Sequence, residues 1–220
     1  MTLFEGKRMQ IKVIDHPLIK HKMAFLRDER RSMPEFRKLL HEIGLLMAFD
    51  VTKDLQLAET VIQTPVAVTK AQKLEKHPVL VNILRAGIGM LNPFMEILPK
   101  SRVGFLGMNR DEETLIAHSY YNKIPMQALD NKVLLLDPML ATGGSALSAL
   151  DFLKSKGVTD VTFVCLVAAP EGVKAINEAY PNVTIYTAAL DEKLNEKGYI
   201  VPGLGDAGDR IFGTGDDENL

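Results

Sequence analysis

Residues 133–145 read Val-Leu-Leu-Leu-Asp-Pro-Met-Leu-Ala-Thr-Gly-Gly-Ser, and a helical pattern follows over 145–156. The first four residues form an apolar run with the length of a buried strand. An acid and a loop of small residues then lead into the helix. This order predicts one strand-loop-helix unit of an α/β protein.

Four further apolar runs have the same character, and they lie at 79–84, 103–108, 161–168 and 183–186. Helical patterns separate most of the runs, at 88–98, 145–156 and 171–179. Alternating strands and helices predict a mostly parallel sheet flanked by helices. Because ligands of such sheets bind at the carboxyl ends of the strands, the loops that follow the strands are the candidate site.

The N-terminal part is predicted to be helical over 1–60. Pro34 favours a helix start with Ser32 as its cap, and an amphipathic stripe follows at Phe36, Leu39, Leu40, Ile43 and Met47. Residues 61–69 alternate around Pro65, which indicates an edge strand or a hairpin arm. We expect a single domain over 1–220, with an α/β core over 79–190 and a C-terminal segment over 198–214.

The composition is that of a globular protein. The chain has 220 residues, of which 46% are hydrophobic and 25% are charged, close to the usual averages. A formal net charge of −2 argues against a nucleic-acid binder that works by bulk charge. Cys165 is the one cysteine, which excludes an intrachain disulfide and a multi-cysteine zinc site.

No targeting or membrane segment is predicted. The N-terminal residues lack the apolar stretch of a signal peptide. No run approaches the roughly 18 apolar residues of a membrane span. We therefore expect a cytoplasmic protein with no membrane partner and no nucleic-acid partner.

The loop after residue 136 has the chemistry of a phosphate site. Gly143 and Gly144 allow close approach of the backbone, Thr142 and Ser145 add hydroxyls, and the helix start presents free N–H groups. No Lys precedes the last Ser, so the loop is not that of an NTPase. Asp137 can accept hydrogen bonds from sugar hydroxyls, so a phosphosugar fits both parts. The alternative is an ordinary turn that caps a helix.

Two other loops carry candidate residues. Arg85 follows the strand at 79–84, and its planar guanidinium suits phosphate oxygens; a surface Arg before a helix is the alternative. Residues 203–208 spell G-x-G-x-x-G, but too few residues follow for a dinucleotide-binding unit. A glycine-rich segment with exposed backbone can instead bind a planar base through its main-chain N–H and C=O groups.

Three motifs resemble those of a known family. DPMLATGGS at 137–145 resembles the signature of type I phosphoribosyltransferases, with Pro138 in place of a second acid, as in their uracil branch. ILRAG at 83–87 is similar to the pyrophosphate loop of the uracil phosphoribosyltransferases, and GYIVPGLGDAGDR at 198–210 to their uracil-binding segment. Further similarity at 15–22, 167–172 and 186–188 extends the resemblance over most of the chain.

The resemblance implies a type I phosphoribosyltransferase fold and Mg²⁺-dependent transfer of phosphoribosyl from phosphoribosyl pyrophosphate to N1 of uracil. It implies catalytic roles for four residues, Arg85, Arg110, Asp137 and Asp206. The two arginines would take leaving-group charge, Asp137 would hold the ribose, and Asp206 would lie on the metal-linked side. It also implies substrate contacts from these four and from Pro138, Met139, Leu140, Ala141, Thr142, Gly143, Gly144, Ser145, Ile200, Gly205 and Ala207. Mg²⁺ would bind mainly through the substrate and water, without a dedicated protein site.

The polar stretch 109–124 resembles the flexible hood of this family, which closes over the substrate and excludes water. Arg110 would meet the pyrophosphate there, whereas His118, Tyr120 and Lys123 are equally well explained as a solvated loop. The family further implies a homo-oligomer, a dimer or tetramer, and GTP as a possible activator.

Three alternatives stay open from the residues alone. The cradle permits a phosphoribosyltransferase for orotate, guanine or adenine, although the C-terminal segment argues against it. A second alternative is a pyrimidine-responsive regulator that has this fold and binds RNA, which the net charge of −2 does not favour. The third is an allosteric module without activity.

Overall fold

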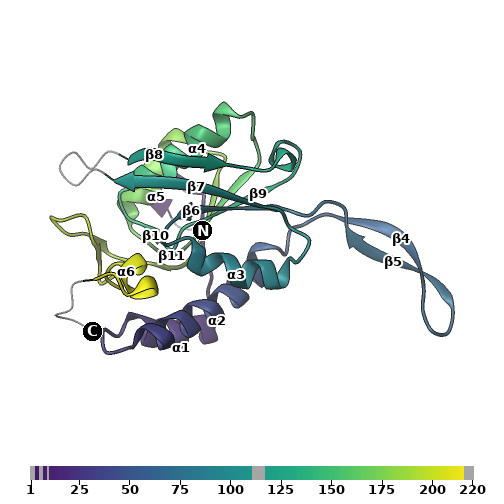
Figure 1. Ribbon diagram of the computed structural model, residues 1–220, viewed down its shortest axis with the longest axis horizontal. Coiled ribbons are helices and arrows are strands. Elements are labelled where there is room, and N and C mark those ends of the chain that lie inside the picture. The colour runs from purple at the N-terminus through teal and green to yellow at the C-terminus, as the bar shows by residue number, and fades with distance from the viewer. Residues whose placement is uncertain (1–2, 5–6, 9, 111–116, 216–220) are drawn as a thin grey trace.

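The computed structural model describes residues 3–4, 7–8, 10–110 and 117–215, with side chains described for 10–108 and 120–215. Its centre is a sheet in the order β3-β12-β11-β9-β6-β7-β8, with β10 paired to β11 (Figure 1). Among the described residues, every pairing in this sheet is parallel except that of β7 with β8. The strands are β3 (Ile11–Val13), β6 (Val79–Leu84), β7 (Val103–Arg110), β8 (Ala117–Lys123), β9 (Val133–Leu136), β10 (Met139–Leu140), β11 (Val161–Ala168) and β12 (Thr184–Leu190).

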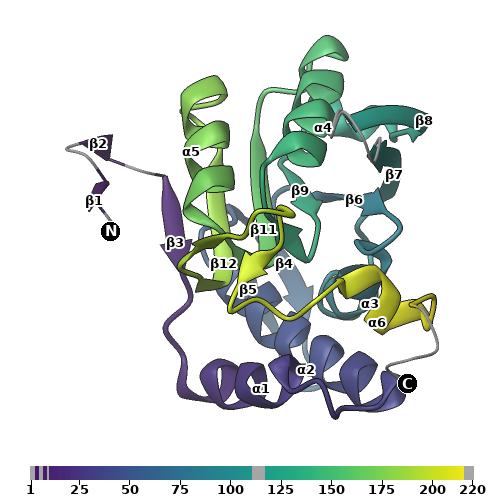
Figure 2. The same cartoon turned by 90° about the vertical axis from the view of Figure 1, so that its left-hand side faces the viewer.

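Helices cover both faces of the sheet (Figures 1 and 2). The face with Leu134 and Leu136 shares a hydrophobic cluster with the first three helices. Leu135 belongs to the cluster that includes the fourth and fifth helices. This double cover explains why β9 and β11 are buried along their whole length. The first three helices are α1 (Pro17–Arg27), α2 (Met33–Val51) and α3 (Ile88–Ile97), and the other two are α4 (Gly144–Ser155) and α5 (Pro170–Ala179).

The predicted start of α2 is confirmed. The Glu35 carboxylate accepts hydrogen bonds from the Ser32 N–H at 3.0 Å and from the Ser32 hydroxyl at 2.9 Å, and Pro34 lies in the first turn. The predicted stripe faces the core, with its members at 36, 40, 43 and 47 buried. No described helix is long and apolar enough to cross a membrane.

The expectation of helices throughout 1–60 is wrong, because strands β1 to β4 begin within this range. Strand β3 joins the central sheet by pairing with β12, and β4 (Leu57–Gln63) starts before residue 60. A three-residue strand is too short for an alternation signal, because pairing with a distant strand and not its own sequence defines it. The other short elements are β1 (Leu3–Phe4), β2 (Lys7–Arg8), the 3₁₀ helix η1 (Met126–Leu129), β13 (Lys193–Leu194), β14 (Ile200–Val201) and α6 (Ala207–Phe212).

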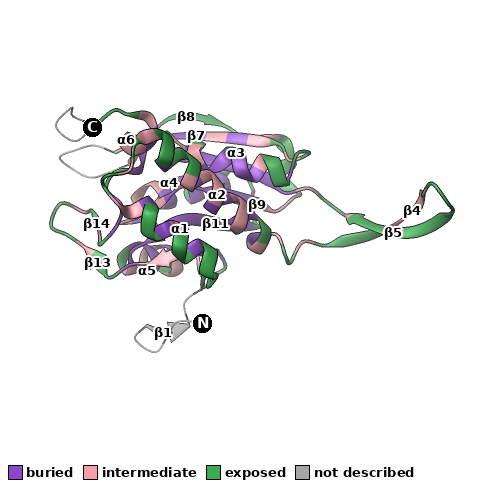
Figure 3. Cartoon of the chain, turned by 90° about the horizontal axis from the view of Figure 1, so that it is seen from below, coloured by how far each residue is buried: buried purple, intermediate pink, exposed green. Residues whose placement is uncertain are grey.

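The hairpin interpretation around Pro65 is confirmed. β4 pairs with β5 (Val68–Leu74) in an antiparallel ribbon. Its turn is closed by the Thr64 hydroxyl, which accepts a hydrogen bond from the Ala67 N–H at 3.0 Å. The ribbon projects away from the body of the molecule, on the side opposite to α6 (Figure 1), and it is largely exposed (Figure 3).

The stretch 109–124 is not a continuous loop. β7 extends to residue 110, and β8 returns antiparallel to it over 117–123. Strand β8 is polar because it lies at the edge of the sheet, where one side of a strand is left to solvent. Residues 111–116 lie outside the described part of the chain, so the expected flexible hood stays a prediction.

Candidate functional site

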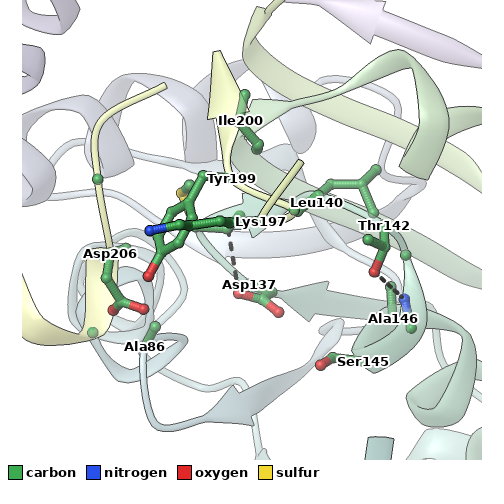
Figure 4. Close-up of a pocket in the computed structure, with 18 residues that line it drawn as sticks. Ala86, Asp137, Leu140, Thr142, Ser145, Ala146, Lys197, Tyr199, Ile200 and Asp206 are labelled. Atoms are coloured by element: carbon green, nitrogen blue, oxygen red, sulfur yellow. Dashed lines mark hydrogen bonds between the residues drawn. The ribbon is translucent and has the colours of Figure 1, made fainter. Parts of the chain in front are cut away.

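A cavity of about 590 Å³ lies at the carboxyl ends of the strands. Two segments that are far apart in the sequence supply most of its lining (Figure 4). One is the loop after β9 with the start of α4, residues 137 and 139–146. The other is the C-terminal segment, residues 197–200 and 205–208, and Ala86 completes the lining. The predicted phosphate loop and the predicted base-binding segment therefore face the same space.

The turn into α4 forms a cradle of free N–H groups. The first helical hydrogen bond runs from the Leu147 N–H to the Gly143 carbonyl at 2.8 Å. The N–H groups of Ser145 and Ala146, which line the cavity, thus have no acceptor within the helix. The Thr142 hydroxyl accepts a long hydrogen bond, 3.4 Å, from the Gly144 N–H. Such a helix start can bind an anion the size of a phosphate.

Gly143 is required by the backbone of this cradle. Its φ of +89° lies in the left-handed region, which side chains disfavour. A Cβ atom here would lie 3.2 Å from Cβ of Ala175 and 3.4 Å from the Gly172 carbonyl oxygen. A larger residue would therefore move the loop away from α5 and change the cradle.

Strand β11 holds the cradle loop from below. The Asp137 N–H donates to the Val164 carbonyl at 3.1 Å. The Pro138 carbonyl accepts from the Leu166 N–H at 3.0 Å, and the Leu140 carbonyl accepts from the Ala169 N–H at 2.8 Å. Pro138 is buried and is not among the described residues that line the cavity, so its expected substrate contact has no support in the geometry.

Asp137 is the half-buried acid at the floor of the cavity (Figure 4). Burial raises the pKa of its carboxyl to about 7, and the nearby negative charge of Asp206 acts in the same direction. A hydrogen bond of 3.3 Å from the Met139 N–H favours the carboxylate and opposes this rise. Because this pKa is about 7, a bound cation or a hydroxyl that donates a hydrogen bond would favour the ionised form of the Asp137 carboxyl.

The C-terminal segment crosses the cavity as a short strand, a turn and α6. β14 pairs with β13, the Val201–Pro202 peptide is cis, and Gly203 and Gly205 have φ of +62° and +77°. Asp206 caps α6 by accepting a hydrogen bond from the Asp209 N–H at 2.9 Å. The predicted contacts Ile200, Gly205, Asp206 and Ala207 all line the cavity.

Of the two predicted arginines, only Arg85 has a described side chain, and it is not part of the cavity lining. Arg85 directly follows β6 and is exposed, and its peptide bond with Leu84 is cis. Among the described lining residues its neighbour Ala86 is present and Arg85 is not. The side chains of Arg110 and His118 lie outside the described residues.

The two longest lining side chains that were not predicted come from the C-terminal segment. Lys197 and Tyr199 line the cavity (Figure 4), and they come from the hairpin that joins β13 to β14. Asn195 closes this hairpin, because its side-chain oxygen accepts from the Lys197 and Tyr199 N–H groups at 3.0 and 2.9 Å. The Asn195–Gly198 turn signal could have placed them beside the site. Gly198, Ala86, Ala146 and Gly208 were missed as well.

Comparisons with known proteins agree with this geometry. A family model described as Uracil phosphoribosyltransferase matches residues 13–214. The uracil phosphoribosyltransferase of Streptococcus uberis is 57% identical over 203 residues, which cover 92% of this chain and 97% of that protein. The uracil phosphoribosyltransferase of Enterococcus faecalis is 52% identical over 206 residues, or 93% of this chain and 99% of that one.

Solved structures share the fold of this chain. A protein of Aquifex aeolicus superposes with a TM-score of 0.90 at 40% identity, covering 94% of this chain and 99% of its own. A hypoxanthine-guanine phosphoribosyltransferase of Bacillus anthracis reaches 0.51 at 12% identity, covering 72% of this chain and 80% of its own, a likeness of fold alone. The prediction of a type I phosphoribosyltransferase fold is confirmed, and the chain belongs to the uracil phosphoribosyltransferase family.

Proposed function

We propose that the protein transfers 5-phosphoribosyl from phosphoribosyl pyrophosphate to N1 of uracil, giving UMP and pyrophosphate. The observation that carries this proposal is one cavity in which a phosphate cradle and a glycine-rich backbone segment lie on either side of Asp137. A phosphorylated sugar fits against the cradle and Asp137, and a planar base fits against the glycine-rich segment. The family match supports uracil as that base.

In this reaction the N1–C1′ bond forms as the C1′–oxygen bond to pyrophosphate breaks, and the N1 proton is released. The cradle at 142–146 would bind the 5′-phosphate and Asp137 would accept from the ribose hydroxyls. Main-chain groups at 200 and 205–207 would orient uracil, and Arg85 and Arg110 would take leaving-group charge. The enzyme then works by positioning its substrates and stabilising charge, without a covalent nucleophile.

The site also fits Mg²⁺ bound through the substrate. Asp137 and Asp206 both line the cavity, whereas no group of three or more potential ligands occurs among the described residues. One or two carboxylates together with substrate oxygens and water are the usual environment of Mg²⁺. When bound, the cation would neutralise pyrophosphate charge. Asp206 would face it on the open side of the cavity.

The assay that tests the function measures UMP formation from uracil and phosphoribosyl pyrophosphate, with Mg²⁺ and with a chelator. Orotate, hypoxanthine and adenine serve as competing bases. Turnover with uracil alone that the chelator abolishes is the expected result. Turnover with another base would overturn the role of the C-terminal segment, and no turnover by folded protein would overturn the enzymatic proposal.

We also propose a homo-oligomer, a dimer or tetramer. The β4–β5 hairpin supports this because it exposes Val61, Val66 and Val68 at 65%, 93% and 67%, and an isolated two-stranded ribbon is only marginally stable in water. Light scattering on the double variant Val61→Lys with Val68→Lys should give a smaller mass than the wild type. An unchanged mass would contradict a role of the hairpin, and a monomeric wild type would contradict the oligomer itself.

GTP activation and a cytoplasmic location are proposed on narrower grounds. GTP as activator rests on the family likeness, and a GTP series in the same assay tests it. A reducing compartment suits a chain whose one cysteine, Cys165, is a buried free thiol in β11. Fractionation of the source cells would test the location.

A further inference from the structure

One backbone unit of the base-binding segment is held from both of its polar groups. The Gly203 N–H donates to the Asp191 carboxylate at 2.9 Å. The Gly203 carbonyl accepts from the Arg27 guanidinium at 2.5 Å. The same guanidinium donates to both oxygens of Asp191, at 2.6 and 2.8 Å. These three residues form a closed arrangement that joins the end of α1, the end of β12 and the turn after β14.

Gly203 has little freedom of its own. Its φ is +62°, and a Cβ atom would lie 2.1 Å from the Ile200 carbonyl oxygen. It stands two residues before the lining residues 205–208. A shift at Gly203 would therefore be passed to the main-chain groups that face the base.

A second guanidinium secures the next residue. Arg210 donates to the Leu204 carbonyl at 3.0 Å and to the Leu26 and Asp28 carbonyls at 2.8 and 2.7 Å. It stacks over Phe36 with its central carbon 4.3 Å from the ring centroid. The end of α1 is thus linked to the segment at two consecutive positions.

The Arg27–Asp191 pair is costly to bury. The side chains are exposed by only 22% and 4%, and removing two charges from water offsets much of their attraction. Packing alone would be served as well by apolar side chains. The Arg27–Asp191 pair supplies directed hydrogen bonds to the Gly203 backbone, which apolar side chains cannot make.

We propose that Arg27 and Asp191 are positioning residues for uracil. This inference rests on the proposed function. Neither residue lines the cavity, so each acts through Gly203 on the placement of main-chain groups 204–207. The phosphate cradle depends on β9, β11 and α4 instead. Loss of the pair should therefore weaken the use of uracil selectively and leave phosphoribosyl pyrophosphate little affected.

Kinetics of Arg27→Lys and Asp191→Asn test this selectivity. Arg27→Lys keeps the positive charge but loses the planar guanidinium that donates two hydrogen bonds at once. Asp191→Asn keeps the shape of the side chain but loses its negative charge. We expect the KM for uracil to rise about tenfold or more for each variant. The KM for phosphoribosyl pyrophosphate should stay within about twofold. Asp160→Asn, which removes the surface partner of Lys132 at 2.9 Å, is the matched control and should change neither constant.

A second readout does not need activity. Hydrogen-deuterium exchange at 203–207 should become faster in Arg27→Lys and Asp191→Asn, while exchange at 142–147 stays as in the wild type. An equal rise of both KM values, or unchanged exchange at 203–207, would overturn the inference. If the wild type fails to use uracil, the proposed function fails, and the exchange data still decide whether the pair positions the segment.

Discussion

The two halves of the cavity are built in different ways. The loop at 137–145, which leads into the proposed phosphate cradle, is continuous in the sequence, and its backbone is bonded to the adjacent strand β11. The proposed base-binding segment at 198–208 is held by the side chains of Asp191 and Arg210, which flank it in the sequence, and of Arg27, which lies 176 residues from Gly203. A half-site held by its own sheet can be recognised in a short motif. The contact of Arg27 with the C-terminal segment, by contrast, becomes visible only in the folded structure.

The largest effect is expected at Gly143, because its left-handed backbone conformation shapes the start of the cradle. Gly143→Ala should lower kcat/KM for phosphoribosyl pyrophosphate about a hundredfold, by strain at φ +89° and by contact with Ala175. Steady-state kinetics would measure this.

Gly157→Ala is its matched control. Gly157 has φ +88° just beyond the other end of α4, and a Cβ atom there would make only an ordinary contact with Leu129 Cδ2 at 3.7 Å. Both variants should lose about 1 kcal/mol of unfolding free energy. A similar loss of activity in both would mean that the cradle geometry is not special.

At the base-binding segment, Gly203→Ala should raise the KM for uracil about tenfold or more. The added methyl cannot coexist with the Ile200 carbonyl at 2.1 Å, so the turn must move. Gly213→Ala is the control, because its φ is +68° but the nearest atom is the flexible Met33 sulfur at 3.0 Å. Equal KM values for uracil in the two variants would break the distinction between the halves.

The pH dependence should single out the cradle acid. Because Asp137 has its pKa raised from 3.8 to about 7 on folding, the unfolded chain loses this proton first as pH rises. Its contribution to the free energy of unfolding is full below pH 3.8, decreases up to about pH 7 and is level above. Denaturant titrations of wild type and Asp137→Asn should therefore diverge over this range. Parallel curves would contradict the raised pKa.

The smallest effect is expected at Lys197, which lines the cavity from a surface hairpin. Lys197→Met should change either KM by about threefold, since an exposed charge is screened by solvent. Lys193→Met, on the neighbouring strand β13, is the control. A change of a hundredfold would make Lys197 part of the catalytic machinery.

The sequence predicted the cradle almost completely because each of its requirements is local: an apolar strand, an acid, glycines and a helix start. Four helices and the five longer buried or half-buried strands were found through the same local patterns. Strand β3 was missed because only its pairing with β12 defines it. The Arg27–Asp191 pair was missed because its partners are 164 residues apart, and no spacing rule connects them.

The stretch 109–124 shows that composition alone does not distinguish a loop from an edge strand. A polar composition suggested a loop over 109–124, whereas an edge strand can be equally polar, as β8 is. Pro138 shows that membership of a motif does not by itself predict a substrate contact. Its motif suggested a substrate contact, but its carbonyl bonds to β11 and its side chain is buried. Motif membership does not tell a residue that meets the ligand from one that holds the loop.

A crystal structure of the protein with bound UMP would show directly whether the cradle binds the phosphate and the glycine-rich segment binds the base. We expect the 5′-phosphate within hydrogen-bond distance of the N–H groups of 142–146. We also expect the uracil ring against main-chain groups of 200 and 205–207, with Gly203 still bonded to Arg27 and Asp191. A phosphate bound outside the cradle, or a base held by side chains away from the glycine-rich segment, would contradict these expectations.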